Sequence, residues 1–401
     1  MWLSFNCEFC NGQIWSNMVK LPLQAFKEVV IDESNPFIVN ALRNRKHYEH
    51  CWCGSAKKYK KCHLRRKYEQ PYELGQLLHL QREIFWRKRG CMHPLASAAT
   101  CSGKVIDSHT IQRKGPLEKI VDETGHVMHF ETTQERKGLA ASKIGWRKAS
   151  IFPGYCSGHD TSLFAPLETA VFSGDHSQCV LLAFRNICNE LYRKQALVES
   201  LEFQRHLIDR GCDRDEQINR QFSYIENIEA QKKSKEEMTK LKCTFESAVK
   251  NGDLSKFESR VYYFSGELSV VSSSILHCEF DFFGNKLIDM WDLSKDAELL
   301  SHSTVNAGSG GAVVFVWLKE EKTPSKVVDS FNRIPNDEKG DIFVQYNFLN
   351  CENTFFSNGW WDNLSYKDQS LVQRYSNSLY YEGGKFNANK IRWVNWGFTN
   401  K

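Results

Sequence analysis

Two groups of cysteine and histidine residues carry the strongest chemical signal in this chain. The first is the run C-W-C-G-S-A-K-K-Y-K-K-C-H, which extends from Cys51 to His63. Zn2+ takes four Cys or His ligands in a tetrahedron, and a short loop can bring two close ligand pairs together. Gly54 can adopt the backbone angles of a tight turn after the first pair. We therefore expect a zinc site formed by Cys51, Cys53, Cys62 and His63.

This run resembles the SEC-C zinc motif, whose usual form is C-P-C-G-S-G-K-K-Y-K-K-C followed by Cys or His. Trp52 stands where that motif has proline, and Ala56 stands where it has its second glycine. Neither change touches a ligand, and the resemblance covers about residues 49–66. It implies a small zinc-folded module that uses one structural Zn2+.

Basic residues surround this motif. The net charge of the whole chain is only +5, but Glu49 is the only acid between Arg43 and Lys67, a segment that holds ten Lys or Arg residues. Such a local positive field suits a polyanion, with nucleic acid as the first candidate and DNA favoured. An acidic protein surface is the alternative partner. The residues that we expect to contact nucleic acid are Lys57, Lys58, Lys60, Lys61, Arg65 and Arg66.

The second group is spread over a longer segment. It runs as C-x9-C from Cys91, then S-H-T-I from Ser108, then C-x2-H-D from Cys156. This order, a ligand pair, a histidine on an apolar stretch and another ligand pair, resembles the zinc-stapled HNH endonucleases, which have a ββα-metal fold. The resemblance covers about residues 90–165.

The HNH resemblance implies roles for particular residues. His109 falls at the position of the general base, which deprotonates water for attack on a phosphodiester, and histidine suits that role because its pKa lies near neutrality. Asp160 falls at the position of a ligand of the catalytic ion, Mg2+ or Mn2+, which screens phosphate charge and stabilises the leaving oxygen. A second structural zinc site is implied at Cys91, Cys101, Cys156 and His159.

The sequence departs from the HNH pattern in three places. The first ligand pair is spaced x9 instead of x2, and Ser108 stands where the family has a metal-binding Asp. No Asn occurs between His109 and Cys156. His126 or His129 could take the middle role, which would give a His-His-Asp arrangement.

Two functions therefore remain open. The first is a metal-dependent endonuclease in which the basic SEC-C module holds the phosphate backbone. The second is a non-catalytic adaptor, in which His109 only stabilises a treble-clef-like zinc domain, or in which His109 or His93 replaces one of the zinc ligands. SEC-C motifs elsewhere serve as zinc-folded docking modules, which is compatible with the adaptor.

Three further segments resemble HNH-like proteins of bacteria that have not been characterised. They read S-H-T-I-Q-R, Y-C-S-G-H-D-T-S-L-F-A-P-L-E and L-A-F-R-N-I-C-N-E-L-Y. Stand-alone nucleases of that kind are often associated with defence against phage or mobile elements, and this association is by analogy.

The elements that must position these residues follow from hydrophobic periodicity. Residues 72–89 predict an amphipathic helix with a basic end, and residues 181–250 predict two long helices that form a hairpin near Gly211. Beyond Gly252, the stretches VYYFSGEL, SSILHCEFDFFG, AVVFVWL and DIFVQYNFL are rich in β-branched and aromatic residues. This composition predicts strands and therefore a C-terminal domain that is β-rich or α+β.

Composition places the chain among multi-domain α+β proteins. It has 401 residues, no apolar run near the ~20 residues of a membrane span, and no basic-then-apolar start that would indicate a secretory signal. Fourteen Cys residues then favour a reducing, cytoplasmic compartment and metal binding. A homodimer through the helices and a protein partner for the C-terminal domain are also expected.

The expected domains are an N-terminal segment 1–45, the SEC-C module 46–68, a basic helix 69–90, an HNH-like domain 91–180, long helices 181–252 and the β-rich domain 253–401.

Overall fold

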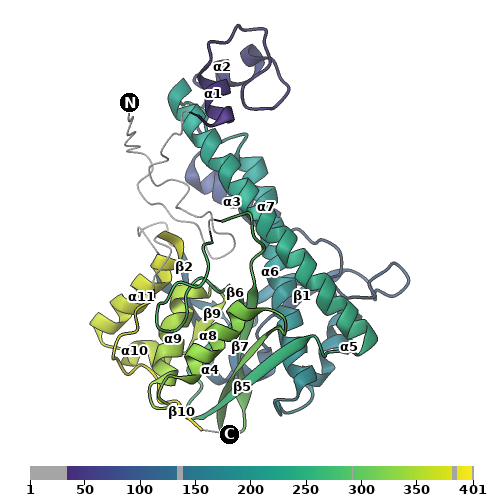
Figure 1. Ribbon diagram of the computed structural model, residues 1–401, viewed down its shortest axis with the longest axis vertical. Coiled ribbons are helices and arrows are strands. Elements are labelled where there is room, and N and C mark those ends of the chain that lie inside the picture. Colours follow the sequence, from purple (N-terminus) through teal and green to yellow (C-terminus); the bar gives the residue numbers. More distant parts are fainter. Residues whose placement is uncertain (1–33, 133–138, 291, 382–385, 400–401) are drawn as a thin grey trace. The chain divides into compact units, whose positions relative to one another are not determined.

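The computed structural model describes residues 34–132, 139–290, 292–381 and 386–399 (Figure 1). Helices and antiparallel strands both contribute, which confirms the mixed helix-and-sheet class at the level of secondary structure. A Cys7-x2-Cys10 pair at the start of the sequence lies outside the described residues. Among the described helices, none has both the length and the apolar character that a membrane span requires.

The chain divides into two compact units, which we describe separately. The first unit comprises the residues up to Phe85 together with Arg193–Lys233, and the second comprises Trp86–Tyr192 and Ser234–Lys401. Two long helices, α6 (His176–Gln204) and α7 (Arg214–Asn251), each contribute residues to both units.

The first unit is built from short helices and the adjoining ends of α6 and α7. Gly211 lies between those two helices with a φ of +76°, a backbone angle that favours glycine, as expected for the predicted hairpin. A small core joins α1, the cysteine-rich loop and α7, since Phe37 of α1 contacts both Trp52 of the loop and Phe222 of α7, with ring centroids 5.8 and 6.0 Å apart. The short helices are α1 (Pro36–Leu42), the 3-10 helix η3 (Tyr59–Lys61), α2 (His63–Arg66) and α3 (Leu74–Phe85).

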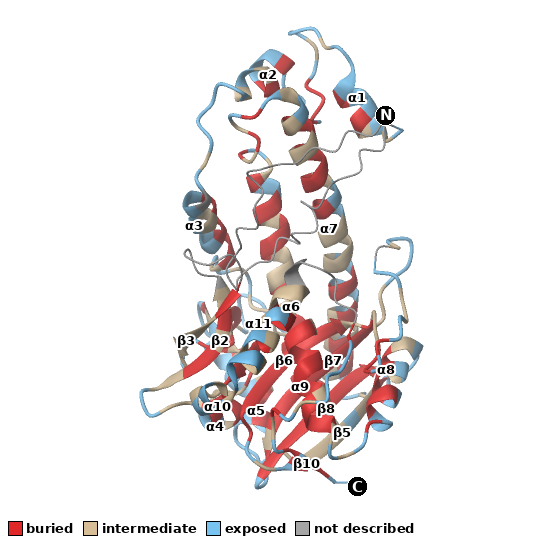
Figure 2. Ribbon diagram, turned by 90° about the vertical axis from the view of Figure 1, so that its left-hand side faces the viewer, coloured by how far each residue is buried: buried red, intermediate tan, exposed pale blue. Residues whose placement is uncertain are grey.

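An eight-stranded antiparallel sheet forms the centre of the second unit, in the order β10-β5-β8-β7-β6-β9-β2-β3. Figure 2 shows its middle strands coloured as buried. Two of its strands, β2 and β3, come from the stretch that the sequence assigned to the HNH-like domain. The strands are β2 (His126–Thr132), β3 (Leu139–Gly145), β5 (Phe257–Ser265), β6 (Val270–His277), β7 (Leu299–Ala307), β8 (Gly310–Leu318), β9 (Thr354–Phe356) and β10 (Gly397–Phe398).

The prediction of a strand at residues 341–349 was wrong, because this stretch lies inside the helix α9 (Lys339–Asn350). Ten of its twelve residues are buried. The aromatic and β-branched residues of this stretch are buried on all sides of the helix, and a short stretch of that kind cannot be distinguished from a buried strand by periodicity alone. The C-terminal part of the chain is therefore a mixture of helices and strands.

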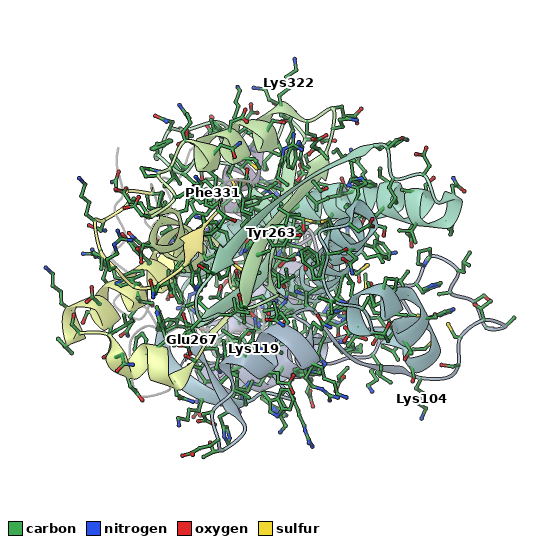
Figure 3. The ribbon with its side chains drawn as sticks, turned by 90° about the horizontal axis from the view of Figure 1, so that it is seen from below. Lys104, Lys119, Tyr263, Glu267, Lys322 and Phe331 are labelled. Carbon is green, nitrogen blue, oxygen red and sulfur yellow. The ribbon has the colours of Figure 1, made fainter. Side chains whose placement is uncertain are left out.

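Further short elements complete the second unit. In Figure 3, Lys322 at the start of α8 points outward, whereas Phe331 near its end lies inward, where it is fully buried. These elements are the π-helix η4 (Arg113–Leu117), α4 (Glu118–Ile120), α8 (Lys322–Asn332), α10 (Asn358–Asn363) and α11 (Tyr366–Tyr381).

A separate two-stranded sheet belongs to the same unit. β1 (Val105–His109) pairs in antiparallel register with β4 (Ile151–Cys156), and α5 (Ser157–Glu168) follows β4 directly. The chain between β1 and β4 makes a detour that includes β2 and β3. β1, β4 and α5 therefore have the order strand, strand, helix. The segment inserted between β1 and β4 contributes β2 and β3 to the eight-stranded sheet.

Candidate metal centres and the ββα site

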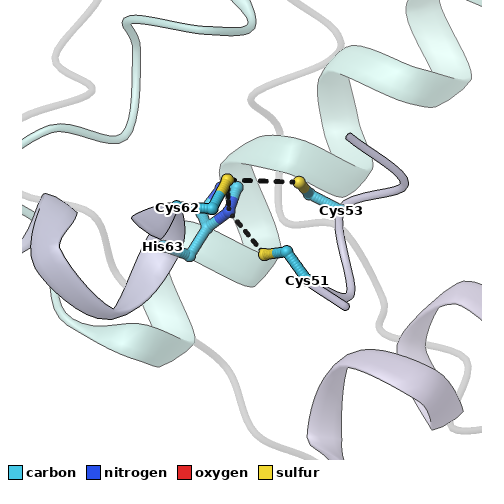
Figure 4. Close-up of side chains that lie close together, drawn as sticks. All are labelled: Cys51, Cys53, Cys62 and His63. Atoms are coloured by element: carbon cyan, nitrogen blue, oxygen red, sulfur yellow. Dashed lines mark hydrogen bonds between the residues drawn. The ribbon is translucent and has the colours of Figure 1, made fainter. Parts of the chain in front are cut away.

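The first cysteine-rich motif forms a compact cluster of four ligand atoms (Figure 4). The side chains of Cys51, Cys53, Cys62 and His63 place these atoms within 4.8 Å of one another. The Sγ atoms of Cys53 and Cys62 are 3.7 Å apart, and Nδ1 of His63 is 3.1 Å from Sγ of Cys51. Two 2.3 Å zinc–sulfur bonds at a tetrahedral angle place their sulfurs about 3.8 Å apart. The cluster therefore has dimensions suited to a tetrahedral ion.

Local backbone structure explains why these four residues meet. The amide of Cys51 donates to the carbonyl of Lys57 at 2.8 Å, which closes the loop after the first ligand pair. Gly54 lies in that loop with a φ of +78°. Cys62 and His63 follow at the junction of η3 and α2, so a tight turn and a short helix present the two pairs to each other.

The electrostatics of this cluster favour the thiolate form at Cys53 and Cys62, whereas hydrogen bonds with Cys53 and Cys62 raise the pKa of Cys51. Hydrogen bonds from the side chains of Cys51 and Cys62 lower the pKa of the Cys53 thiol far below its usual range. Contacts within the cluster, first with Cys51, also lower the pKa of Cys62. The thiolate is the form of cysteine that binds metal, so the cluster is prepared for a cation.

The second cluster brings together residues from three separate segments of the second unit. Nδ1 of His159 lies 3.5 Å from Sγ of Cys91 and 3.7 Å from Sγ of Cys101. Cys156, at the end of β4, completes a set whose ligand atoms also lie within 4.8 Å of one another. The ring of His93 stacks on that of His159 with centroids 3.9 Å apart, outside the four-ligand set.

Hydrogen bonds hold this second cluster in place. The amide of Cys156 donates to Sγ of Cys91 at 3.3 Å, and the amide of Gly158 donates to Oγ of Ser102 at 2.7 Å. Burial tends to raise the pKa of Cys156, but contacts with His159, Ser102 and Cys91 outweigh burial and lower it to about 6. A thiol with this pKa is largely ionised at neutral pH and can bind a metal.

Ser108, His109 and Asp160 lie in the same ββα unit. Ser108 and His109 end β1, and Asp160 lies in the first turn of α5. The Ser108 hydroxyl interacts with the Asp160 carboxyl and lowers its pKa, although burial raises that pKa overall. Arg185 of α6 acts electrostatically on both Asp160 and His109. The elements thus position the histidine and the carboxylate that sequence reasoning paired.

Several residues of the segments that form this site have buried side-chain atoms without a hydrogen-bond partner. Such atoms are rare in folded proteins, and each requires an explanation such as an ion, a water molecule or a functional role. Among the described residues of this unit, they include Ser108 Oγ, His109 Nε2, Thr110 Oγ1, Tyr155 OH, Asp160 Oδ1, and Nε and Nη1 of Arg185.

The protonation of His109 is set by its surroundings. Burial, followed by the charges of Arg113 and Arg185, lowers the pKa of His109 to about 4. A hydrogen bond with the backbone of Arg147 acts in the opposite direction. Because Nε2 has no partner, Nδ1 is the nitrogen that can donate to Arg147. The imidazole is therefore neutral at pH 7, with a lone pair on Nε2.

His126, which was predicted for the middle role of the HNH-like site, does not lie on β1, β4 or α5. His126 begins β2 in the eight-stranded sheet, pairs in register with Gly145, and has Nδ1 2.9 Å from Oγ1 of Thr124.

The six residues predicted to bind nucleic acid lie in the first unit. Five of them are exposed, and Arg66 is half-buried because it contacts Asp209.

Two residues of these sites escaped sequence reasoning. Arg185 reaches the ββα site from α6, and Asp209 reaches His63 from the α6–α7 turn with Oδ2 2.7 Å from Nε2. Arg185 lies in α6 and Asp209 in the turn after it, and neither belongs to a pattern of metal-ligand spacing. Each side chain comes close to its site only when the chain folds. Arg185 belongs to the segment L-A-F-R-N-I-C-N-E-L-Y, one of those that resemble HNH-like proteins, but no residue pattern pointed to Arg185 itself or to Asp209.

Comparison with known proteins identifies one motif. The family model described as the SEC-C motif matches residues 49–65, which contain the first cluster. No curated protein and no solved structure matches the chain. The comparison therefore supports metal binding at the first cluster, and the second cluster is supported by its geometry alone.

Proposed function

We propose that this protein is a metal-dependent endonuclease of HNH type that cleaves phosphodiester bonds, with DNA as the favoured substrate. The observation that carries the proposal is the ββα unit, in which His109 ends β1, Asp160 lies in the first turn of α5, and the charge of Arg185 acts on both side chains. Defence against phage or mobile elements is the setting that we propose for it.

His109 has the properties of a general base in this proposal. Its imidazole is neutral at pH 7, and its free nitrogen is the one that could accept a proton from the attacking water. The backbone at Arg147 fixes the ring through the other nitrogen. Histidine is thereby oriented before substrate binds, which lowers the cost of reaching the transition state.

A divalent ion fits the donor set at Asp160. Mg2+ prefers oxygen ligands and commonly uses only one or two carboxylates together with water. The Asp160 carboxylate and the Ser108 hydroxyl supply such oxygens. The ion would stabilise negative charge on the reacting phosphate. Arg185, whose Nη2 is bonded to Glu168 at 2.8 Å, would contribute positive charge beside the same carboxylate.

The surface of the SEC-C module supports nucleic acid as the substrate class. The lysines at 57, 58, 60 and 61 are all exposed. Backbone hydrogen bonds such as Lys60 N to His47 O, at 3.0 Å, bring the basic segment beside the loop that carries Tyr48, which is 62% exposed. Basic side chains interleaved with an exposed aromatic ring suit a phosphate backbone and a stacked base.

A zinc-folded adaptor that binds nucleic acid or protein is the second candidate. The observation in its favour is that His109 Nε2 and Asp160 Oδ1 are both buried from solvent. Ser108 in place of a carboxylate also weakens the set of ligands for a catalytic ion. The same basic surface would then serve binding alone.

Cleavage of plasmid and single-stranded substrates with Mg2+, Mn2+ and Ni2+ tests the proposal. We expect cleavage by the wild-type chain and a loss of about 10²–10⁴-fold in His109→Ala and Asp160→Ala, because each removes a group that acts in the transition state. His79→Ala, at an exposed position on α3, is the matched control.

Cleavage decides between the two candidate functions, and metal content checks that each variant is folded. Each variant should retain as much structural metal as the wild type, which shows that folding is intact. Full cleavage by His109→Ala would rule out the assignment of the base. Absence of cleavage by wild type under every ion, together with tight nucleic-acid binding, would favour the adaptor.

A further inference from the structure

The first metal cluster has a neighbour from a distant part of the sequence. Asp209, in the turn between α6 and α7, is fully buried, and its Oδ2 lies 2.7 Å from Nε2 of His63. The other nitrogen of that ring, Nδ1, faces the thiols of Cys51 at 3.1 Å and Cys62 at 3.3 Å. One imidazole therefore spans the ligand set and the carboxylate.

Asp209 is held in position by partners other than His63. Arg66 donates from Nη1 to Oδ1, and Gln221 donates from Nε2 to Oδ2 at 3.2 Å. The contact of His63 Nε2 with this carboxylate, 2.7 Å from Oδ2, is an ion pair between two buried side chains. The carboxylate therefore faces the ring nitrogen that points away from the thiols.

The turn also contacts the backbone of the motif. Arg205 donates from Nη2 to the carbonyl of Cys53 at 2.7 Å. The amide of Gly211 donates to the carbonyl of Arg66 at 2.8 Å, and Nη2 of Arg214 donates to the carbonyl of Ala41 at 2.8 Å. These bonds attach the turn to the chain before, within and after the ligand run. The cluster is thus built against the hairpin and does not stand alone.

We propose that Asp209 is a positioning residue of this metal centre, which links occupancy of the centre to the order of the α6–α7 turn. A carboxylate beside the non-ligating nitrogen of a metal-bound histidine fixes the tautomer and the ring orientation, and it increases the basicity of the ligating nitrogen. Here the carboxylate keeps the proton on Nε2, so that Nδ1 offers its lone pair to the ion.

The first test measures metal affinity in the full chain with a chromophoric chelator as competitor and Zn2+ as the probe. Asp209→Asn keeps the shape of the side chain and removes its charge. We expect it to weaken Zn2+ binding at the first centre by about 10–100-fold. Asp215→Asn, the same substitution at an exposed position at the start of α7, is expected to have no effect. The second cluster, in the other unit, is an internal reference whose affinity should not change.

A double-mutant cycle separates positioning from general damage to the fold. A thiolate has no second nitrogen, so a His63→Cys chain retains four ligands without any use for the carboxylate. In that background, we expect Asp209→Asn to change Zn2+ affinity by less than about 3-fold. The proposal is overturned if Asp209→Asn leaves the affinity of the native chain unchanged, or if it causes an equal loss in both backgrounds.

The second test requires no substitution. Amide hydrogen exchange of the full chain, measured with and without bound metal, should show faster exchange across residues 205–221 when the metal is removed, because the turn loses a fixed partner at His63. Peptides from α9 in the other unit provide the reference. Unchanged exchange at 205–221 after complete metal removal would contradict the link.

Discussion

His302 shows how burial at one residue sets a response to pH. The residue lies on β7 with no exposed surface, and its Nε2 is 3.1 Å from Oγ of Ser272. Asn347 of α9 donates to the same hydroxyl at 2.8 Å, so the hydroxyl proton is available to His302 as an acceptor. Burial lowers the pKa of His302 to about 3. The imidazole is therefore neutral at pH 7.

The stabilising effect of neutral His302 should fade in acid. The pKa in the folded state is below the value of about 6.5 in the unfolded chain, so the unfolded state binds the proton first. The contribution is complete above pH 6.5 and falls as the pH approaches 3. We expect a loss on the order of 3 kcal/mol between pH 7 and pH 4.

Urea unfolding of the wild type and of His302→Gln at several pH values checks this expectation. Glutamine can accept from Ser272 but does not titrate, so the variant should lose less stability on acidification, whatever its stability at pH 7. Parallel pH dependence in the two chains would show that His302 does not contribute.

Among individual residues, the sequence predicted the metal ligands from their spacing but did not predict the side chains that contact those ligands from distant parts of the chain. Cys51, Cys53, Cys62 and His63 meet because a local turn brings them together, so their sequence pattern was enough. Asp209 meets His63 only after the helical hairpin has folded. The spacing of residues within a short segment predicts contacts inside that segment. It does not predict contacts with residues that are distant in the sequence.

At the scale of elements, α9 is the clearest example of burial overriding local preference. Its aromatic and β-branched residues predict a strand, but the segment forms a helix packed on every side. Phe343 near its centre is 1% exposed, and its ring faces those of Phe315 and Phe331 at centroid distances of 6.2 and 6.0 Å. Packing against the sheet selects the helix.

Phe343→Ala should therefore destabilise the second unit strongly. Removing a buried aromatic ring leaves a cavity, and we expect the free energy of unfolding to fall by about 3–5 kcal/mol. Tryptophan fluorescence during denaturation measures the change. Phe283→Ala is the control, since that ring is 50% exposed and its loss should cost less than about 1 kcal/mol. Equal effects of the two substitutions would contradict the packing argument.

At the scale of the whole molecule, each compact unit contains one metal cluster. This arrangement predicts that the two centres load independently. Cys62→Ser and Cys156→Ser should each reduce bound metal from two ions per chain to one, as measured by elemental analysis after dialysis. Cys243→Ser, at an exposed cysteine outside both clusters, should retain two. Loss of both ions in either ligand variant would show that the centres depend on each other.

The segment inserted between β1 and β4, which contains β2 and β3, has a consequence during protein synthesis. The hairpin of β2 and β3 is complete at Gly145, yet its neighbour β9 begins only at Thr354, about 200 residues later. At a translation rate of ~5–20 residues per second, the free edge of β2 waits roughly 10–40 s for its partner. An unpaired edge is a template for pairing with other chains. Slower ribosomes therefore lengthen the period in which the nascent chain is prone to aggregate, and soluble yield should depend on the speed of translation between these two points.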